Sequence, residues 1–260
     1  MTSRRNVFRA IQLCVLMPVL GAPAMGAEGI DPEADKILKS MSSYLTTAKA
    51  FSMNTDVALE VVLQNGQKLQ LCSSYSLLLR RPSEFRIRVK GMVADAEFTF
   101  DGKTLTLFGR KRNAYVQRDV PGTIDDAIRA WEWETGIAAT GADLLLTRVY
   151  SILTSEVETS AYLGTGYVNG IECHHLALRK DEVDVQLWVE TGDRPLPIKY
   201  VITTKWMTGA PQFELVLRDW NTSPEVKDGQ FTFSAPEGAR KLDKVPTEEM
   251  DEFPVAKEAQ

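Results

Sequence analysis

Apolar and polar residues alternate with a period of two over much of the chain, and this pattern constrains the fold more than any other feature of the sequence. From residue 51 to residue 63 most odd positions are apolar and most even positions are polar. Such alternation is typical of a β-strand with one face in the core and the other in water. It recurs in short segments as far as residue 217, and helical segments do not separate the individual strands. The sequence therefore predicts a mainly β (α+β) protein with an open antiparallel sheet of about ten or eleven strands around an apolar groove.

Two turn signals set the register of the predicted hairpins. A three-residue loop that ends at Gly66 keeps the apolar faces of its two strands together and pairs Leu59 with Leu71. Asp101-Gly102 is typical of a two-residue hairpin turn, which pairs Phe98 with Leu105. In both hairpins the apolar side chains then lie on one face of the sheet.

Helical patterns precede and interrupt the strands. Asp31-Pro32 supplies an N-cap and a first-turn proline, and apolar residues follow at helical spacing as far as residue 48. Thr123 and Asp126 have the spacing of a capping box and predict a second helix over about 123–134. A third helix is predicted over about 142–153. We therefore expect an N-terminal helix and two central helices beside the sheet.

The first residues of the chain are typical of an export signal. Arg4 and Arg5 precede an apolar run from 11 to 20, which is too short to span a membrane. We expect a signal peptide over residues 1–27, with cleavage after Ala24 or near Ala27, and a periplasmic protein. Export by the general secretory route is expected, and the arginine pair leaves a twin-arginine route open. The predicted domain covers residues 28–245, and residues 246–260 are predicted to form an acidic disordered tail.

Charge and cysteine content limit the functional classes. The leader contains three arginines and no acidic residue, so its removal changes the net charge from −5 to −8. This acidity excludes a protein that follows nucleic-acid phosphates, and we expect no stable membrane insertion after cleavage. Only Cys72 and Cys173 follow the leader. An oxidising compartment permits them to pair, and two separate thiols are the other possibility.

No residue set predicts catalysis or a cofactor. Glu172, Cys173, His174 and His175 are consecutive, but in a strand they divide between opposite faces, so no metal site is predicted. The chain contains no Gly-x-Ser-x-Gly motif, and its Gly164-x-Gly166 is not followed by a helix. The expectation is a protein that is not an enzyme.

Arg81 is the charged residue whose position most needs an explanation. It follows Leu77 and Leu79 at the same parity, so its side chain is directed toward the apolar face. A guanidinium there needs backbone carbonyls under a lid, a carboxylate or a ligand head group as its partner. The other possibility is that Pro82 ends the strand early and Arg81 extends to water at the rim.

Three segments together resemble a known family. They are Arg81-Pro82-x-x-Phe85, the turn at 101–105 and the ending at 231–238, which is similar to a closing strand and turn. In order and spacing they resemble the periplasmic outer-membrane lipoprotein carriers (LolA/LolB-like). The chain looks closest to a group of uncharacterised predicted periplasmic proteins with the same fold. The resemblance covers roughly residues 31–243.

The resemblance implies an incomplete barrel, or half-barrel, closed by lid helices over a cavity for acyl chains. It gives Arg81 the role of holding the lid through backbone contacts. Together with the parity of the strands, it predicts a set of ligand-binding or lid residues: Arg81, Phe85, Leu77, Leu79, Phe98, Leu105, Ile124, Ile128, Leu144 and Leu145. The expected function is binding or carriage of a lipid, a lipoprotein acyl chain or another amphiphile. The alternative is a sensor or regulatory module that binds an envelope protein partner.

Overall fold

A computed structural model describes residues 29–245 except residue 93. The predicted signal peptide and acidic tail lie outside the described residues. The strands are β1 (Ala50–Val62), β2 (Lys68–Arg80), β3 (Glu84–Gly91), β4 (Asp95–Phe100), β5 (Thr104–Gly109), β6 (Ala114–Asp119), β7 (Thr159–Val168), β8 (Ile171–Arg179), β9 (Val183–Glu190), β10 (Pro197–Thr204), β11 (Gln212–Asn221) and β12 (Arg240–Leu242). The helices are α1 (Pro32–Thr47), α2 (Ile124–Thr135), the 3₁₀ helix η1 (Ala142–Leu145) and α3 (Val149–Thr154).

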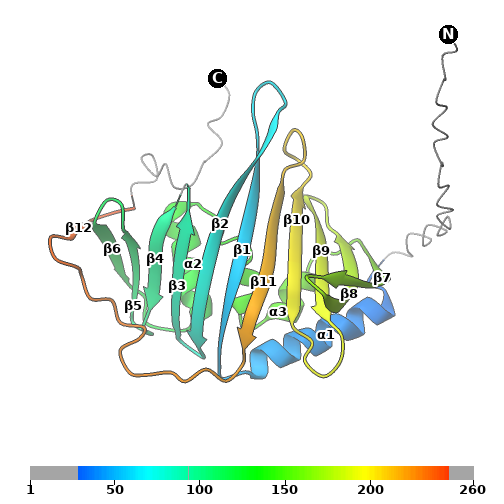
Figure 1. Ribbon diagram of the computed structural model, residues 1–260, viewed down its shortest axis with the longest axis horizontal. Coiled ribbons are helices and arrows are strands. Elements are labelled where there is room, and N and C mark those ends of the chain that lie inside the picture. The colour runs from blue at the N-terminus through cyan, green and yellow to red at the C-terminus, as the bar shows by residue number, and fades with distance from the viewer. Residues whose placement is uncertain (1–28, 93, 246–260) are drawn as a thin grey trace, which may run out of the picture.

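All the strands form one sheet in the order β12-β6-β5-β4-β3-β2-β1-β11-β10-β9-β8-β7 (Figure 1). Neighbouring strands are antiparallel except β12, which runs parallel to β6. The edges of the sheet are β7 and β12, and they do not pair with each other, so the barrel is open. This confirms the predicted mainly β fold with an open antiparallel sheet. The twelfth strand, β12, was not predicted, because three residues are too few to show alternation.

One predicted register is confirmed and the other is wrong. Leu59 pairs with Leu71. Phe98 pairs with Leu107, however, while Phe100 pairs with Leu105. The loop is longer than two residues because the Asp101 carboxylate accepts hydrogen bonds from the backbone N–H groups of Lys103 and Thr104, at 3.0 and 2.8 Å. The shift is two residues, so every apolar side chain stays on its predicted face.

The first two predicted helices are confirmed. Asp31 caps α1, and its carboxylate accepts from the N–H groups of Glu33 and Ala34, both at 2.9 Å. Thr123 and Asp126 form the predicted capping box of α2. Both helices bury apolar side chains in the main core, where α1 packs against α3, η1 and β7.

The prediction of one helix over 142–153 is wrong, since η1 and α3 are separate. Asp125 holds Thr147 between them: its carboxylate accepts from the Thr147 N–H at 3.0 Å and from the Thr147 hydroxyl at 2.7 Å. Leu146 is extended, with φ −68° and ψ 163°. The carbonyl of Leu145, which would continue a helix, instead accepts a hydrogen bond from Arg81. Contacts with distant segments thus override the local helical pattern.

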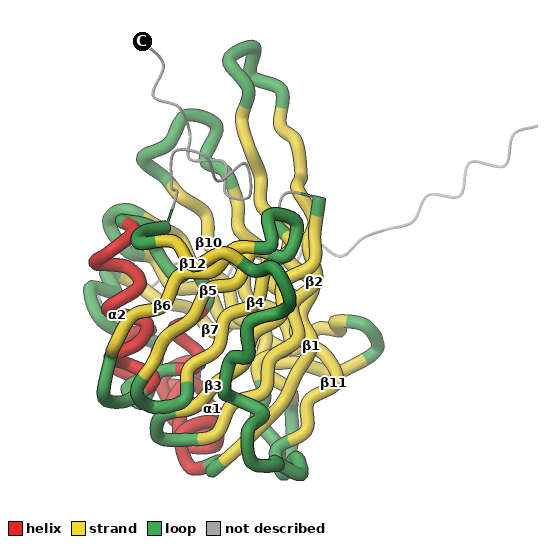
Figure 2. The backbone as a smooth tube through the Cα atoms, turned by 90° about the vertical axis from the view of Figure 1, so that its left-hand side faces the viewer, coloured by secondary structure: helices red, strands yellow, loops and turns green. Residues whose placement is uncertain are grey.

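The helices cover the concave face of the sheet. The connection from β6 to β7 runs through α2, η1 and α3. It crosses this face from β6, next to the edge strand β12, to the opposite edge strand β7. Figure 2 shows the helices on one side of the strands. The main apolar core lies between these two layers.

A second connection crosses the convex face. Residues 222–239, called the outer segment here, lead from β11 in the middle of the sheet to β12 at its edge (Figure 1). The Phe233 ring lies 5.5 Å from the Phe108 ring and 5.0 Å from the Tyr115 ring. The expected closing strand at 231–233 is therefore wrong: these residues are not a strand, and their aromatic side chains pack onto the sheet from outside.

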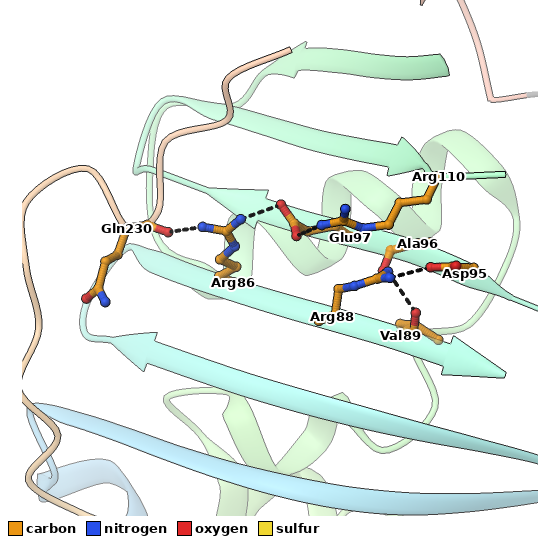
Figure 3. A network of polar contacts seen from close by, with 8 residues as sticks. All are labelled: Arg86, Arg88, Val89, Asp95, Ala96, Glu97, Arg110 and Gln230. Atoms are coloured by element: carbon orange, nitrogen blue, oxygen red, sulfur yellow. Dashed lines mark hydrogen bonds and ion pairs between the residues drawn. The ribbon is translucent and has the colours of Figure 1, made fainter. Parts of the chain in front are cut away.

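A charged network lies beneath the outer segment (Figure 3). Glu97, only 5% exposed, accepts from Arg86 Nη2 and from Arg110 Nη2, both at 2.8 Å. Arg86 Nη1 also donates to the Gln230 carbonyl of the outer segment at 3.2 Å. The buried carboxylate is therefore paired twice, and one of its partners also holds the outer segment.

Candidate functional site

An apolar cavity of about 480 Å³ lies between the inner face of the sheet and the helical layer. Its wall consists of strands β1 to β5 and β11 on one side, and of α2, residues 136–141 and η1 on the other. We call these last three segments the lid. The Phe98 and Trp131 rings meet edge to face across the two layers at 5.1 Å. The backbone of Gly141, at φ +84°, lies so close to β11 that a Cβ atom there would be 2.5 Å from Leu215 Cδ1.

Six of the ten predicted ligand-binding or lid residues line this cavity: Leu77, Phe85, Phe98, Leu105, Ile128 and Leu145. Ile124 and Leu144 belong to the lid, in α2 and η1, but do not line the cavity; with Leu79 they are buried in the adjoining core, at most 1% exposed. Arg81 does not line it either, and it contacts the lid as described below.

The prediction missed several cavity residues: Met53, Val57, Leu59, Leu71, Tyr75, Trp131, Phe213, Leu215 and Leu217. Most of them are at odd positions, like the other residues on the apolar faces of β1, β2 and β11. The alternation therefore indicated that their side chains face the core. The missing information was that β11 pairs with β1, because only that pairing brings Leu215 opposite Val57. Residues 136–141 showed no periodic pattern that a sequence could reveal.

Arg81 is directed into the protein and donates to the lid. Its Nη1 lies 2.9 Å from the Leu145 carbonyl oxygen, and its Nη2 lies 3.5 Å from that of Leu146. Its guanidinium carbon lies 6.0 Å from the centre of the Phe51 ring. Burial lowers the pKa of Arg81, and nearby Asp125 opposes this effect. Of the possibilities left open by the sequence, the structure thus has the guanidinium on backbone carbonyls of the lid.

A second polar contact fixes the other side of η1. The hydroxyl of Tyr200, from β10, donates to Asp143 Oδ2 at 3.0 Å. Tyr200 is 2% exposed. Burial raises the pKa of Asp143, whereas Tyr200 and the Lys180 cation oppose the shift. Arg81 and Tyr200 therefore hold η1 between the two halves of the sheet.

The burial of Asp143 predicts an unusual pH dependence. Because the folded pKa is raised, the folded state binds the proton more tightly, and the stability from Asp143 is full at acid pH and is lost as pH rises through the folded pKa. We expect the stability of Asp143→Asn relative to the unchanged protein to increase as pH rises from the acid range to neutrality. Denaturant unfolding at a series of pH values measures this.

Asp56→Asn is the matched control with the opposite sign. A hydrogen bond from Arg218 lowers the pKa of Asp56, so the stability from this carboxylate is lost as pH falls. The stability of Asp56→Asn relative to the unchanged protein should therefore decrease with rising pH. Parallel profiles for the two variants would contradict the assignment.

The consecutive residues Glu172 to His175 do not converge. The His174 Nδ1 atom lies 3.1 Å from the Tyr162 hydroxyl, whereas the His175 ring stacks on Trp188 at 4.0 Å. Among the described residues, no group of three His, Cys, Asp or Glu side chains is placed to hold a metal ion. Cys72 is exposed and Cys173 is buried, and both are free. Burial raises the pKa of the Cys173 thiol to about 11.

These features define a class of protein: open antiparallel half-barrels in which a lid of helices covers an apolar cavity. Residues 34–244 match the family described as "Predicted periplasmic protein (DUF2092)", and the chain belongs to this family. The expected resemblance to a group of predicted periplasmic proteins and the expected periplasmic localisation are thereby confirmed. No curated protein sequence matches the chain. No helix within residues 29–245 is long and apolar enough to cross a bilayer.

Solved structures with similar folds have low sequence identity to this chain. An uncharacterized conserved protein from Thermus thermophilus is 12% identical, with a TM-score of 0.48, over 82% of this chain and 99% of that chain. The LolA superfamily protein NE2245 from Nitrosomonas europaea is 11% identical, with a TM-score of 0.40, over 77% of this chain and 97% of its own. Lipoprotein LppX from Mycobacterium tuberculosis is 11% identical, with a TM-score of 0.42, over 76% and 100% of the two chains.

Proposed function

We propose that the protein is a periplasmic binding or carrier protein that holds a lipid, a lipoprotein acyl chain or another amphiphile in its cavity. The observation that supports this most directly is the cavity of about 480 Å³ with an almost wholly apolar wall. At about 30 Å³ for a group the size of water, this volume accommodates about 16 methylene groups. It is therefore comparable in size with one long acyl chain.

The affinity would come from burial of the ligand's acyl chain in the cavity. Each Å² of apolar surface removed from water contributes roughly 25 cal/mol. The contacts of Arg81 and Tyr200 hold η1, whose Leu145 lines the cavity. Among the described residues that line the cavity, none is a histidine, acid, lysine or arginine. The hydroxyl of Thr55, one of the few polar groups there, donates to the Val216 carbonyl at 3.0 Å. We therefore assign the cavity to binding and not to catalysis.

The test is to identify what the protein carries. The protein is purified from its native periplasm without detergent, and the extracted molecules are analysed by mass spectrometry. We expect an amphiphile with a long acyl chain in a fixed ratio to the protein. If no amphiphile is recovered and a partner protein co-purifies in equal amount, the regulatory alternative is correct instead.

A cavity-filling variant links that ligand to this cavity. Val57 faces the cavity and is 4% exposed. We expect Val57→Phe to abolish ligand recovery while the melting temperature of the ligand-free protein changes by less than a few degrees, because the new ring fills existing space. The matched control is Val216→Phe, on the opposite face of the neighbouring strand β11, which should retain the ligand. Equal ligand recovery from both variants would place the ligand elsewhere.

A further inference from the structure

Exposed apolar side chains gather at one end of the sheet. The described residues expose seven large apolar side chains, and five of them lie at the end that carries the β1–β2, β3–β4 and β10–β11 turns: Leu63, Leu69, Met92, Trp133 and Trp206. Trp206 is 70% exposed, Met92 73% and Trp133 91%. The cavity wall reaches toward this end through Leu59, Leu71 and Ala94. We call it the turn end.

The strand pairings place these turns together. β1 to β6 form a meander of antiparallel neighbours, so alternate turns lie at the same end, and β11 runs antiparallel to β1. The β1–β2 and β10–β11 hairpins stand side by side above the sheet (Figure 1), where Gly209 lies against the side chain of Val62. Trp133 is in the last turn of α2, whose first residue bonds to Pro82 at the opposite end.

The same end carries a group of cations, although the chain as a whole is acidic. Lys90 lies near the end of β3, and Arg110, Lys111 and Arg112 lie in the β5–β6 turn; all four are exposed, although Arg110 also pairs with Glu97. Lys111 Nζ donates to the Met92 carbonyl at 3.1 Å, which joins the two turns. The acidic residues Asp181 and Glu182 of the β8–β9 turn lie on the other side of this end.

We propose that the turn end is a docking surface for an anionic phospholipid bilayer. The two tryptophans are separate, one near the end of α2 and one in the β10–β11 turn, and do not form one continuous patch. This suits anchoring rings among lipid head groups better than contact with a folded partner. Cations beside them attract lipid phosphates, and each cation near the membrane surface increases the affinity for anionic lipid about fivefold. This proposal does not depend on the identity of the cavity ligand.

The test is sedimentation of the mature protein with vesicles of phosphatidylethanolamine and phosphatidylglycerol, compared with phosphatidylcholine vesicles. We expect binding to the anionic vesicles that weakens with salt. The double variant Trp133→Ser and Trp206→Ser should lower the affinity at least about tenfold, and Lys111→Glu should lower it roughly tenfold. The matched control is Tyr167→Ser on β7, which is 74% exposed and lies toward the opposite end; it should change binding less than about twofold.

Two results would overturn the proposal. One is the absence of binding to protein-free anionic vesicles. If native membranes still bind the protein in that case, the partner is a membrane protein and not the lipid. The other is equal loss of binding in Tyr167→Ser and in the tryptophan variant. Ligand recovery from the cavity tests the carrier function separately, so each proposal fails on its own measurement.

Discussion

Replacement of Arg81 by alanine should lower the free energy of unfolding by about 3 kcal/mol and release the lid. The guanidinium donates to the carbonyls of Leu145 and Leu146, and a hydrogen bond from a charged donor contributes about 1.5–3 kcal/mol. Both carbonyls would lose this partner. Part of the loss is offset, because the guanidinium is itself desolvated and its Nε has no hydrogen-bond partner. For a chain of this size the melting temperature should fall by roughly 10 °C.

The functional part of this prediction concerns the lid. Hydrogen exchange of the amides between residues 142 and 154 should become faster in Arg81→Ala, and a bound amphiphile should dissociate faster. Arg80→Ala is the matched control: Arg80 is adjacent, lies outside the cavity and pairs with Glu84, so its loss should cost no more than about 1 kcal/mol. If the amides of η1 and α3 exchange at unchanged rates, Arg81 does not hold the lid.

The second large effect is expected on the convex face. In the double variant Arg86→Met and Arg110→Met, the buried carboxylate of Glu97 loses both of its partners, and a buried charge left without a partner costs about 3–5 kcal/mol. The outer segment also loses its bond from Arg86 to Gln230. We therefore expect a large decrease in denaturant midpoint.

A triple variant separates the effect of charge from that of packing. Adding Glu97→Leu to the double variant removes the buried charge and should restore most of the stability, because an apolar group of similar size has no such need for a partner. A triple variant as unstable as the double variant would show that the arginine stems, and not the charge pairing, stabilise this face.

The sequence was sufficient for the faces of the strands but not for contacts between distant segments. Alternation assigned Leu77 and Phe98 to the inner face, because the side-chain period of a strand is independent of its partner. The pairing of Phe98 was wrong by two residues, since the Asp101 side chain bonds to its own loop. The break after η1 was not predictable from local propensity, because Arg81 and Asp125 impose it from elsewhere in the chain.

In the candidate site, too, the direction of side chains was predictable from the sequence, whereas contacts between distant residues were not. Parity directed Arg81 inward, and the resemblance to lipoprotein carriers supplied lid carbonyls as its partners. The contact between Tyr200 and Asp143 was missed, because two polar residues far apart in a sequence give no sign that they meet. The contribution of β11 to the cavity was missed for the same reason.

The pairing of β1 with β11 also determines when the cavity exists during folding. The two neighbouring meanders, β1 to β6 and β7 to β11, are built from local hairpins, but the seam that joins them links residues about 160 positions apart, as in the bond from Thr55 to Val216. Contacts with so large a sequence separation form slowly, because the intervening chain loses entropy first. Val57 and Leu215 are paired across this seam and both line the cavity, so either half of the sheet alone forms only part of the cavity wall. The cavity wall is therefore complete only after β11 has paired with β1.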